Sequence, residues 1–185
     1  MKTKDFSEEI IMATNSAKGK NIKKKHAQII SAISFGVSYL ATRDFQGNPL
    51  YHLSGPIAYI AGKLADYYST YQTAKLFEDP RFSDYGLDNG WYESNSSLPL
   101  HPSQKDLSDK RVLPAEIVLG IGTAIVPFAG YGLGVGGLIA YENNKAVVNQ
   151  IKKGLEIGDH VERMISEGSA DEDIRKYLSS LTKKS

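Results

Sequence analysis

The residues whose types and spacing could do chemistry are two carboxylates, a hydroxyl and an amide near the middle of the chain. Asp66 and Thr70 are four positions apart, so on a helix they share one face. Glu93 and Asn95 follow in the polar stretch 93–103. Paired acids serve general acid–base catalysis, but catalytic acids need neighbours that shift their pKa values. Because nothing nearby in the sequence supplies a nucleophile, a base or a metal set, we expect no catalysis from Asp66 or Glu93.

Two interpretations of these residues remain open. In the first, asparagine and serine side chains bond the local backbone in a capped turn, and both carboxylates are solvated. In the second, the polar stretch folds back so that Asn95 or Glu93 meets Asp66 or Thr70 at the surface of a helix. The sequence leaves the role of all four residues unassigned.

Cofactor and metal chemistry have little support elsewhere in the chain. Residues 132–137 match the G-x-G-x-x-G pattern of dinucleotide-binding turns, which requires a preceding strand and an acid about twenty residues further on. Glu156 is near that distance, but the apolar period between 142 and 166 is helical, and glycine is abundant on both sides of the match. The histidines are scattered and cysteine is absent. We therefore predict no catalytic residue, no cofactor and no metal.

The segment that gives the chain its character is uncharged and extends from Ile117 to Tyr141. It has 25 residues, of which seven are glycine. A helix of about 20 apolar residues can span a bilayer. Glycine costs a helix in water about 1 kcal/mol relative to alanine, whereas in lipid small residues four apart form the usual packing surface between helices. The residues predicted to pack helices in or at a membrane are Gly130, Gly132, Gly134, Gly136 and Gly137.

The sequence leaves open whether this segment forms one continuous helix or a helical hairpin. We expect helix over most of its length, with a bend at Pro127, which has no N–H to donate. Residues 129–132 could also turn, so a single span and a hairpin are both compatible with the sequence.

The periodicity of the rest predicts an all-α fold: a helical protein with one glycine-rich apolar membrane-type segment or hairpin. In the region before residue 78, Ser54 and Pro56 are expected to cap and begin the second helix. The expected parts are a basic polar arm at 1–25, a two-helix region at 26–77, an ordered polar loop at 78–112, the glycine-rich apolar segment at 113–141 and amphipathic C-terminal helices at 142–185.

The net charge and the distribution of lysines indicate which classes of binding partner to expect. A net charge of +1 gives no reason to expect a specific nucleic-acid partner. Lysines crowd into residues 18–25, just before the apolar stretch 27–42. Such a run is a solvated arm, the cytoplasmic flank of a membrane segment or a contact with anionic lipid.

Two groups of residues resemble parts of known proteins. The pattern D-x-x-x-T at 66–70, E-x-N-x-x-L at 93–98 and P-S at 102–103 resembles small uncharacterised membrane proteins of bacteria and phages. In those proteins the asparagine is commonly followed by proline, where this chain has Ser96. Residues 165–178 are similar to a short helix–turn–helix common in virion and ejection proteins of phages. Residues 121–139 resemble the hydrophobic hairpins of membrane-penetrating toxins and of ejected virion proteins. The resemblance implies a membrane-embedded helical protein without known catalysis.

From these features we expect a non-enzymatic, membrane-associating structural or ejection-type protein of a phage or phage-like particle. Its expected location is the virion, the host cell membrane or both. The alternative is a resident bacterial inner-membrane binding protein. The expected partners are membrane lipid, further copies of this chain, and other virion or membrane proteins.

Overall fold

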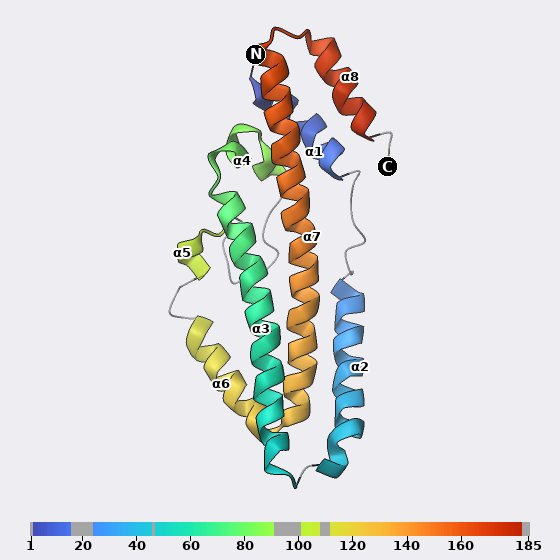
Figure 1. The fold of residues 1–185 in the computed structure, drawn as a ribbon, viewed down its shortest axis with the longest axis vertical. Helices are drawn as coiled ribbons and strands as arrows, with labels where there is room; N and C mark the ends of the chain where they lie inside the picture. The colour runs from blue at the N-terminus through green and yellow to red at the C-terminus, as the bar shows by residue number, and fades with distance from the viewer. Residues whose placement is uncertain (1, 16–23, 46, 91–100, 108–111, 183–185) are drawn as a thin grey trace. The chain divides into compact units, whose positions relative to one another are not determined.

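The computed structural model describes residues 2–15, 24–45, 47–90, 101–107 and 112–182, and every regular element within them is helical (Figure 1). The all-α prediction is therefore confirmed. The α-helices are α1 (Ser7–Asn15), α2 (Lys24–Thr42), α3 (Pro49–Phe77), α4 (Pro80–Asp84), α5 (Gln104–Leu107), α6 (Val112–Ile125), α7 (Pro127–Ser166) and α8 (Asp171–Thr182). Short 3-10 helices cover Thr3–Phe6, Arg43–Phe45 and Leu87–Asn89.

The chain folds into two compact units. Unit 1 comprises Met1–Lys20, Tyr71–Leu107 and Lys145–Ser185, and unit 2 comprises Asn21–Thr70 and Ser108–Asn144. Two long helices, α3 and α7, therefore contribute residues to both units.

Unit 1 has a conventional hydrophobic core. Its buried side chains come from the first 3-10 helix, α1, α4 with the following Tyr85, the Leu87 turn, the second half of α7 and α8. Gly158 lets α7 approach closely, because a Cβ there would come within 3.0 Å of the Tyr85 ring. The core residues are Phe6, Ile10, Ala13, Phe82, Tyr85, Leu87, Ile151, Leu155, Ile157, Val161, Ile174 and Leu178.

Charged groups and a helix stop complete unit 1. Arg175 of α8 pairs with Glu9 of α1 and lies over the Phe6 ring, 5.3 Å from its centroid. Gly168, at φ +79°, ends α7: its N–H bonds Ile165 O and the N–H of Ser169 bonds Met164 O. These two bonds satisfy carbonyls that a helix end leaves free, and only glycine adopts this left-handed conformation readily.

The α3 helix begins earlier than the sequence suggests. Its first residue is Pro49, and the Asn48 side chain accepts a hydrogen bond from the Leu50 N–H at 2.9 Å. Asn48 and Pro49 thus provide the cap and first position that were predicted for Ser54 and Pro56. The prediction for Ser54 and Pro56 was wrong, because a helix already capped at Asn48 accommodates Pro56 in its interior.

The apolar segment forms two helices that meet at a proline. The Val126 N–H bonds Gly122 O to close α6, and the Ala129 N–H bonds Val126 O to open α7. The predicted bend at Pro127 is confirmed. The alternative turn at 129–132 is wrong, since those residues are helical and Pro127 already lacks the N–H that would continue α6.

Replacing Ile10 by alanine tests the core of unit 1. Ile10 is 0% exposed, so Ile10→Ala should lower the free energy of unfolding by roughly 2–5 kcal/mol through lost burial and a cavity. Met12 lies on the same helix but is 56% exposed. Met12→Ala should change stability by less than about 1 kcal/mol in the same denaturant titration. Equal losses in the two variants would contradict this core.

Candidate functional site

The helices α3 and α7 touch backbone to backbone in unit 2. A Cβ added at Gly130 would come within 3.0 Å of the Gly55 backbone, and a Cβ at Gly137 would do the same at Gly62. A Cβ at Gly134 would likewise crowd the backbone of Ala58. Gly55 and Gly62 are seven residues apart, as are Gly130 and Gly137, so α3 and α7 run parallel with matching repeats. Only glycine permits this approach, which is the geometry of small-residue contacts between helices in membranes.

A polar layer follows the glycines at the same spacing. Ser69 is seven residues after Gly62, and Asn144 is seven after Gly137. The Asn144 amide donates to Ser69 Oγ at 3.2 Å and to Thr70 Oγ1 at 3.1 Å, and it lies 3.5 Å from Asp66 Oδ1. Both hydroxyls in turn donate to the Asp66 backbone carbonyl, at 2.8 Å and 3.0 Å. A bonded asparagine at such a position fixes the register of two helices.

This layer is where the structure places two of the four motif residues. Asp66 and Thr70 share a helix face as the sequence predicts, and the side chain that meets them is Asn144. Glu93 and Asn95 lie outside the described residues.

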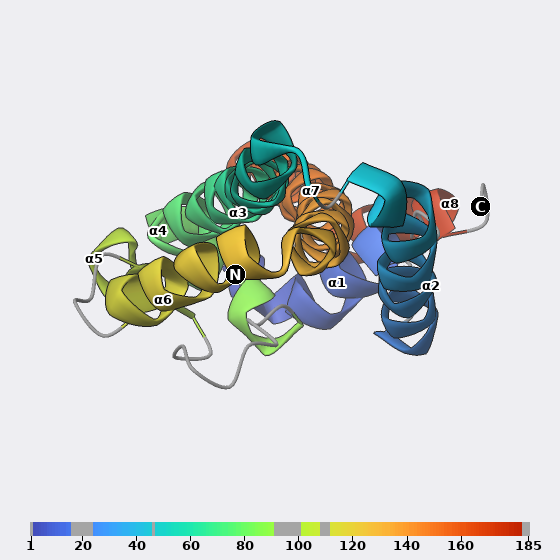
Figure 2. The same cartoon turned by 90° about the horizontal axis from the view of Figure 1, so that it is seen from below.

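The other two helices of unit 2 flank this pair. Gly132 of α7 lies against the Phe35 ring of α2, and Gly136 is half-buried. At the opposite end from Asn144, the Tyr39 and Phe128 rings meet edge to face, with centroids 5.3 Å apart. His52 Nδ1 bonds Ala124 O at the end of α6, at 2.9 Å. The α2–α3 turn and the α6–α7 bend therefore lie at the same end of unit 2 (Figure 2).

The interior of unit 2 is made of small and polar residues. Among the residues of unit 2 whose burial is described, those that are buried are glycines and hydroxyl side chains, apart from Tyr51, Tyr59 and Pro127. The buried residues are Tyr51, Gly55, Tyr59, Gly62, Ser69, Thr123, Pro127, Gly130, Gly132, Gly134 and Gly137.

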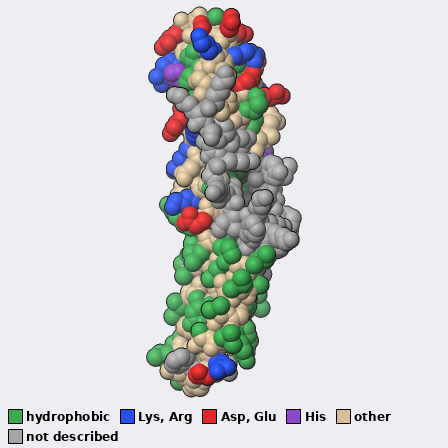
Figure 3. Space-filling model, turned by 90° about the vertical axis from the view of Figure 1, so that its right-hand side faces the viewer, with side chains coloured by type: hydrophobic (Ala, Val, Ile, Leu, Met, Phe, Trp, Pro, Cys, Tyr) green, Lys and Arg blue, Asp and Glu red, His purple; other side chains and the backbone are tan. Residues whose placement is uncertain are grey.

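The large hydrophobic side chains of unit 2 face outward instead. Of the exposed large hydrophobic residues in the described chain, all except Met12 and Tyr71 belong to unit 2. On α3 they form a stripe from Leu50 (70% exposed) to Leu64 (63%). On the face shown in Figure 3, hydrophobic side chains gather over the helices of unit 2. A patch of this extent on a protein surface marks contact with a membrane or with another protein.

The outward apolar face of unit 2 consists of the exposed large hydrophobic side chains of its four helices and of Val126. They are Ile29, Ile30, Ile33, Val37, Tyr39 and Leu40 on α2; Leu50, Leu53, Ile57, Ile60, Leu64, Tyr67 and Tyr68 on α3; Ile117, Val118, Leu119, Ile121 and Ile125 on α6; Val126; and Leu138 on α7.

Two further properties concern the described residues alone. None of their helices combines the length and the mean hydropathy of a membrane-spanning helix. Within the same ranges, no three histidine, cysteine, aspartate or glutamate side chains are grouped so that they could hold a metal ion.

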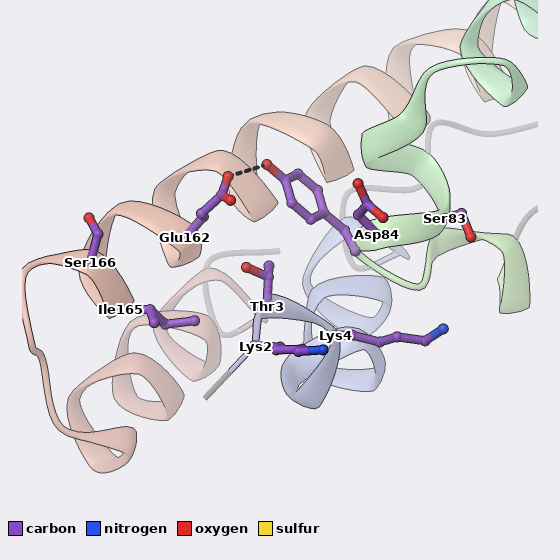
Figure 4. Close-up of a pocket in the computed structure, with 9 residues that line it drawn as sticks. Lys2, Thr3, Lys4, Ser83, Asp84, Glu162, Ile165 and Ser166 are labelled. Atoms are coloured by element: carbon purple, nitrogen blue, oxygen red, sulfur yellow. Dashed lines mark hydrogen bonds between the residues drawn. The ribbon is translucent and has the colours of Figure 1, made fainter.

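Unit 1 contains a separate hollow of about 490 Å³ (Figure 4). At its wall the Tyr85 hydroxyl lies 2.7 Å from Asp159 Oδ1 and 2.9 Å from Glu162 Oε2, and its one proton serves both carboxylates. Burial, together with these two carboxylates, raises the pKa of Tyr85. The tyrosine therefore keeps its proton and joins α4 to α7 rather than acting as a base. The hollow is lined by Lys2, Thr3, Lys4, Ser83, Asp84, Tyr85, Glu162, Ile165 and Ser166.

Arg81 extends this polar group. It bridges Asp79 at 2.7 Å and Asp159 at 2.9 Å, and its hydrogen bonds hold the pKa of Asp79 below the usual value. The cation thereby offsets the charge of the carboxylates that surround Tyr85.

Sequence reasoning missed the α3 half of the glycine contact and missed Asn144. The signal was present as two matching repeats, Gly55-x₆-Gly62-x₆-Ser69 and Gly130-x₆-Gly137-x₆-Asn144. A seven-residue spacing of small residues on two helices indicates that they pack together.

Alanine at Gly62 should break the α3–α7 contact. A Cβ there would come within 3.0 Å of the Gly134 backbone, so Gly62→Ala should lower the melting temperature although alanine favours helix by about 1 kcal/mol. Gly36 is the matched control, because nothing lies within 4 Å of a Cβ at this helical position. Gly36→Ala should leave the melting temperature unchanged or raise it. If both variants melt alike, the helices do not touch at Gly62.

The hydrogen bonds of the Tyr85 hydroxyl should make the free energy of unfolding depend on pH at high pH. Because the pKa of Tyr85 is raised in the folded state, its contribution is complete below the unfolded pKa of about 10. Above that pH the unfolded chain loses the proton first, so the free energy of unfolding falls as pH rises. Tyr85→Phe should be less stable near neutrality by about 1.5–3 kcal/mol and should show a shallower decline above pH of about 10. Parallel pH curves for the two proteins in urea titrations would contradict the assignment.

No protein-family model matches this chain, and no curated protein or solved structure is significantly similar to it. What the protein does must therefore be inferred from its own residues.

Proposed function

We propose that this protein is a non-enzymatic, membrane-associating structural or ejection-type protein of a phage or phage-like particle, and that unit 2 is the part that meets lipid. One observation carries the proposal: unit 2 keeps glycines and hydroxyls inside and turns its large apolar side chains outward. In water this arrangement forgoes roughly 25 cal/mol for every Å² of apolar surface left exposed. In lipid the same arrangement is favourable, because acyl chains cover the outer face and small residues let the backbones pack.

The distribution of charge supports the same proposal. No Asp, Glu, Lys or Arg occurs in 27–42, 47–62 or 117–141, which make up most of the four helices of unit 2. A charged side chain at the middle of a bilayer costs about 2.5–3.5 kcal/mol on insertion scales. Among the charged residues of unit 2 whose side chains are described, Arg43 and Asp44 follow the end of α2, and Lys63, Asp66 and Glu142 lie near the positions where α3 and α7 continue into unit 1.

The proposal that the protein is not an enzyme rests on the contacts of Asp66, the candidate catalytic acid. Asp66 lies beside Asn144, whose amide is bonded to Ser69 and Thr70. These contacts join two helices and present neither a nucleophile nor a general base to a substrate. Tyr85, whose hydroxyl is held by two carboxylates, has a raised pKa and keeps its proton.

Self-association is part of the proposal but needs a surface other than the predicted one. Gly130, Gly134 and Gly137 already face α3 of the same chain. A homo-oligomer would therefore form through the outward apolar faces or through unit 1.

The assignment to a phage particle rests on the sequence resemblances at 121–139 and 165–178. The alternative assignment is a resident bacterial inner-membrane binding protein. Mass spectrometry separates the two. Purified particles should contain the chain in several copies, whereas the alternative predicts its presence in membranes of cells that make no particles.

Vesicle flotation tests the lipid contact. The full chain should float with vesicles of mixed zwitterionic and anionic phospholipid. The triple variant Leu53→Glu, Ile57→Glu, Leu64→Glu should stay at the bottom of the gradient. These side chains are 59%, 66% and 63% exposed, so the changes leave the interior intact while each adds about 2.5–3.5 kcal/mol to the cost of insertion.

The control carries the same added charge in unit 1. Asn149, Ser179 and Ser180 are exposed, so Asn149→Glu, Ser179→Glu, Ser180→Glu should float like the parent chain. A parent chain that ignores vesicles would overturn the membrane proposal, and so would a triple α3 variant that floats as well as its parent.

A further inference from the structure

We propose that the α2–α3 hairpin of unit 2 crosses the whole apolar layer, so that Arg43, Asp44 and Gly47 at its turn emerge on the far side. This inference rests on the membrane association proposed above and adds how deep unit 2 goes and which residues face the opposite compartment. The alternative is a shallow insertion in which unit 2 lies in one leaflet.

Both ends of the hairpin carry polar groups, and the interval between them carries no charge. At the turn, Arg43 and Asp44 form an ion pair of 3.4 Å with side chains 61% and 81% exposed. At the other end of the interval, α3 carries Lys63 and Asp66, and Asp66 lies next to the amide of Asn144. An apolar interval with polar groups at both ends is expected of helices that cross a bilayer. A helix lying along the membrane surface would instead show charges along one side of its whole length.

The length of the interval favours a crossing over a single leaflet. At 1.5 Å per residue, the outward stripe from Leu50 to Leu64 on α3 is about 21 Å long. The hydrocarbon core of a bilayer is about 30 Å thick, and one leaflet is half of that. A single leaflet would leave roughly 6 Å of the stripe in water and would bring the charged Arg43–Asp44 turn close to the middle of the bilayer, where charges are costly. A crossing leaves a deficit of about 9 Å, which thinning of the bilayer and snorkelling side chains accommodate at a fraction of a kcal/mol per Å.

Exposed tyrosines lie near both ends of the outward apolar face formed by α2 and α3. Tyr39, 46% exposed, lies at the turn end, close to Phe128. Tyr67 and Tyr68, 50% and 57% exposed, lie at the Asn144 end. Tyrosine collects at both interfaces of a membrane, where its ring meets acyl chains and its hydroxyl meets water.

The modest mean hydropathy of each helix is compatible with this geometry. Averages along a helix include the inward glycines and hydroxyls, such as Gly55, Gly62 and Ser69, which lipid does not touch. Between Leu50 and Tyr68 the exposed residues of α3 are leucine, isoleucine and tyrosine, together with His52 and Ala61. Membrane helices routinely place small and polar residues against each other in this way.

Single cysteines report depth in this chain, because it contains none of its own. Gly47 is exposed in the turn, and nothing lies within 4 Å of a Cβ placed there, at Gly36 on α2 or at Gly122 on α6. The variants Gly47→Cys, Gly36→Cys and Gly122→Cys therefore probe the turn and two mid-layer positions without disturbing packing. Ser179→Cys, on the exposed face of α8, is the control for the side of addition.

Each full-length variant is added to preformed vesicles and treated with a membrane-impermeant maleimide, supplied either outside or enclosed inside. Ser179→Cys should react only with the outer reagent, and Gly47→Cys only with the enclosed one. Gly36→Cys and Gly122→Cys should react with either reagent about tenfold more slowly than after denaturation in SDS, because a thiol in apolar surroundings does not ionise.

The outcomes separate this inference from the function on which it rests. If Gly47→Cys reacts with the outer reagent as fast as Ser179→Cys, the hairpin does not cross, although flotation stays positive. Protection of Gly47→Cys from both reagents would leave the turn inside the apolar layer and would equally overturn the crossing. Absence of flotation is a separate result that removes the membrane proposal itself.

Discussion

The backbone contact between α3 and α7 is the constraint on which the rest of unit 2 depends. Gly55 meets Gly130 and Gly62 meets Gly137, and no side chain stands between the helices at these points. Each glycine weakens its own helix in water by about 1 kcal/mol, so the contact must return that energy through close packing. Once the interior is filled by backbone, there is no room for large side chains, and leucines and isoleucines are left on the outer face.

The two units therefore place their apolar residues in opposite ways within one chain. In unit 1, Phe6, Ile10 and Ile151 are buried and charged groups lie outside, as expected of a protein surrounded by water. In unit 2, Leu50, Ile57 and Leu64 are outside. The same two helices, α3 and α7, contribute to both patterns, which change near Ser69 and Asn144. A change of this kind along a continuous helix is the basis of the proposal that unit 2, and not unit 1, meets lipid.

The polar layer shows how a motif that suggests chemistry can instead hold a structure together. The Asn144 amide has two N–H groups, and each finds a hydroxyl acceptor on α3. The hydroxyls of Ser69 and Thr70 in turn donate hydrogen bonds to the backbone carbonyl of Asp66, so every donor in the group is used. In surroundings poor in water an unpaired donor would be costly, so a complete set fixes one register of α3 against α7.

Local rules in the sequence determined the helices themselves. The period of the apolar residues, the missing N–H of Pro127 and the left-handed Gly168 act within a few positions, so helix type, the bend and the end of α7 were predictable. The start of α3 was not, because Asn48-Pro49 and Ser54-x-Pro56 are both valid caps, and neighbouring residues do not choose between them. The partner of the glycines, and of Asp66 and Thr70, was decided only by the tertiary structure. Gly55 and Gly130, or Thr70 and Asn144, are far apart in the chain, and periodicity shows which face of a helix is small or polar but not which other helix it meets.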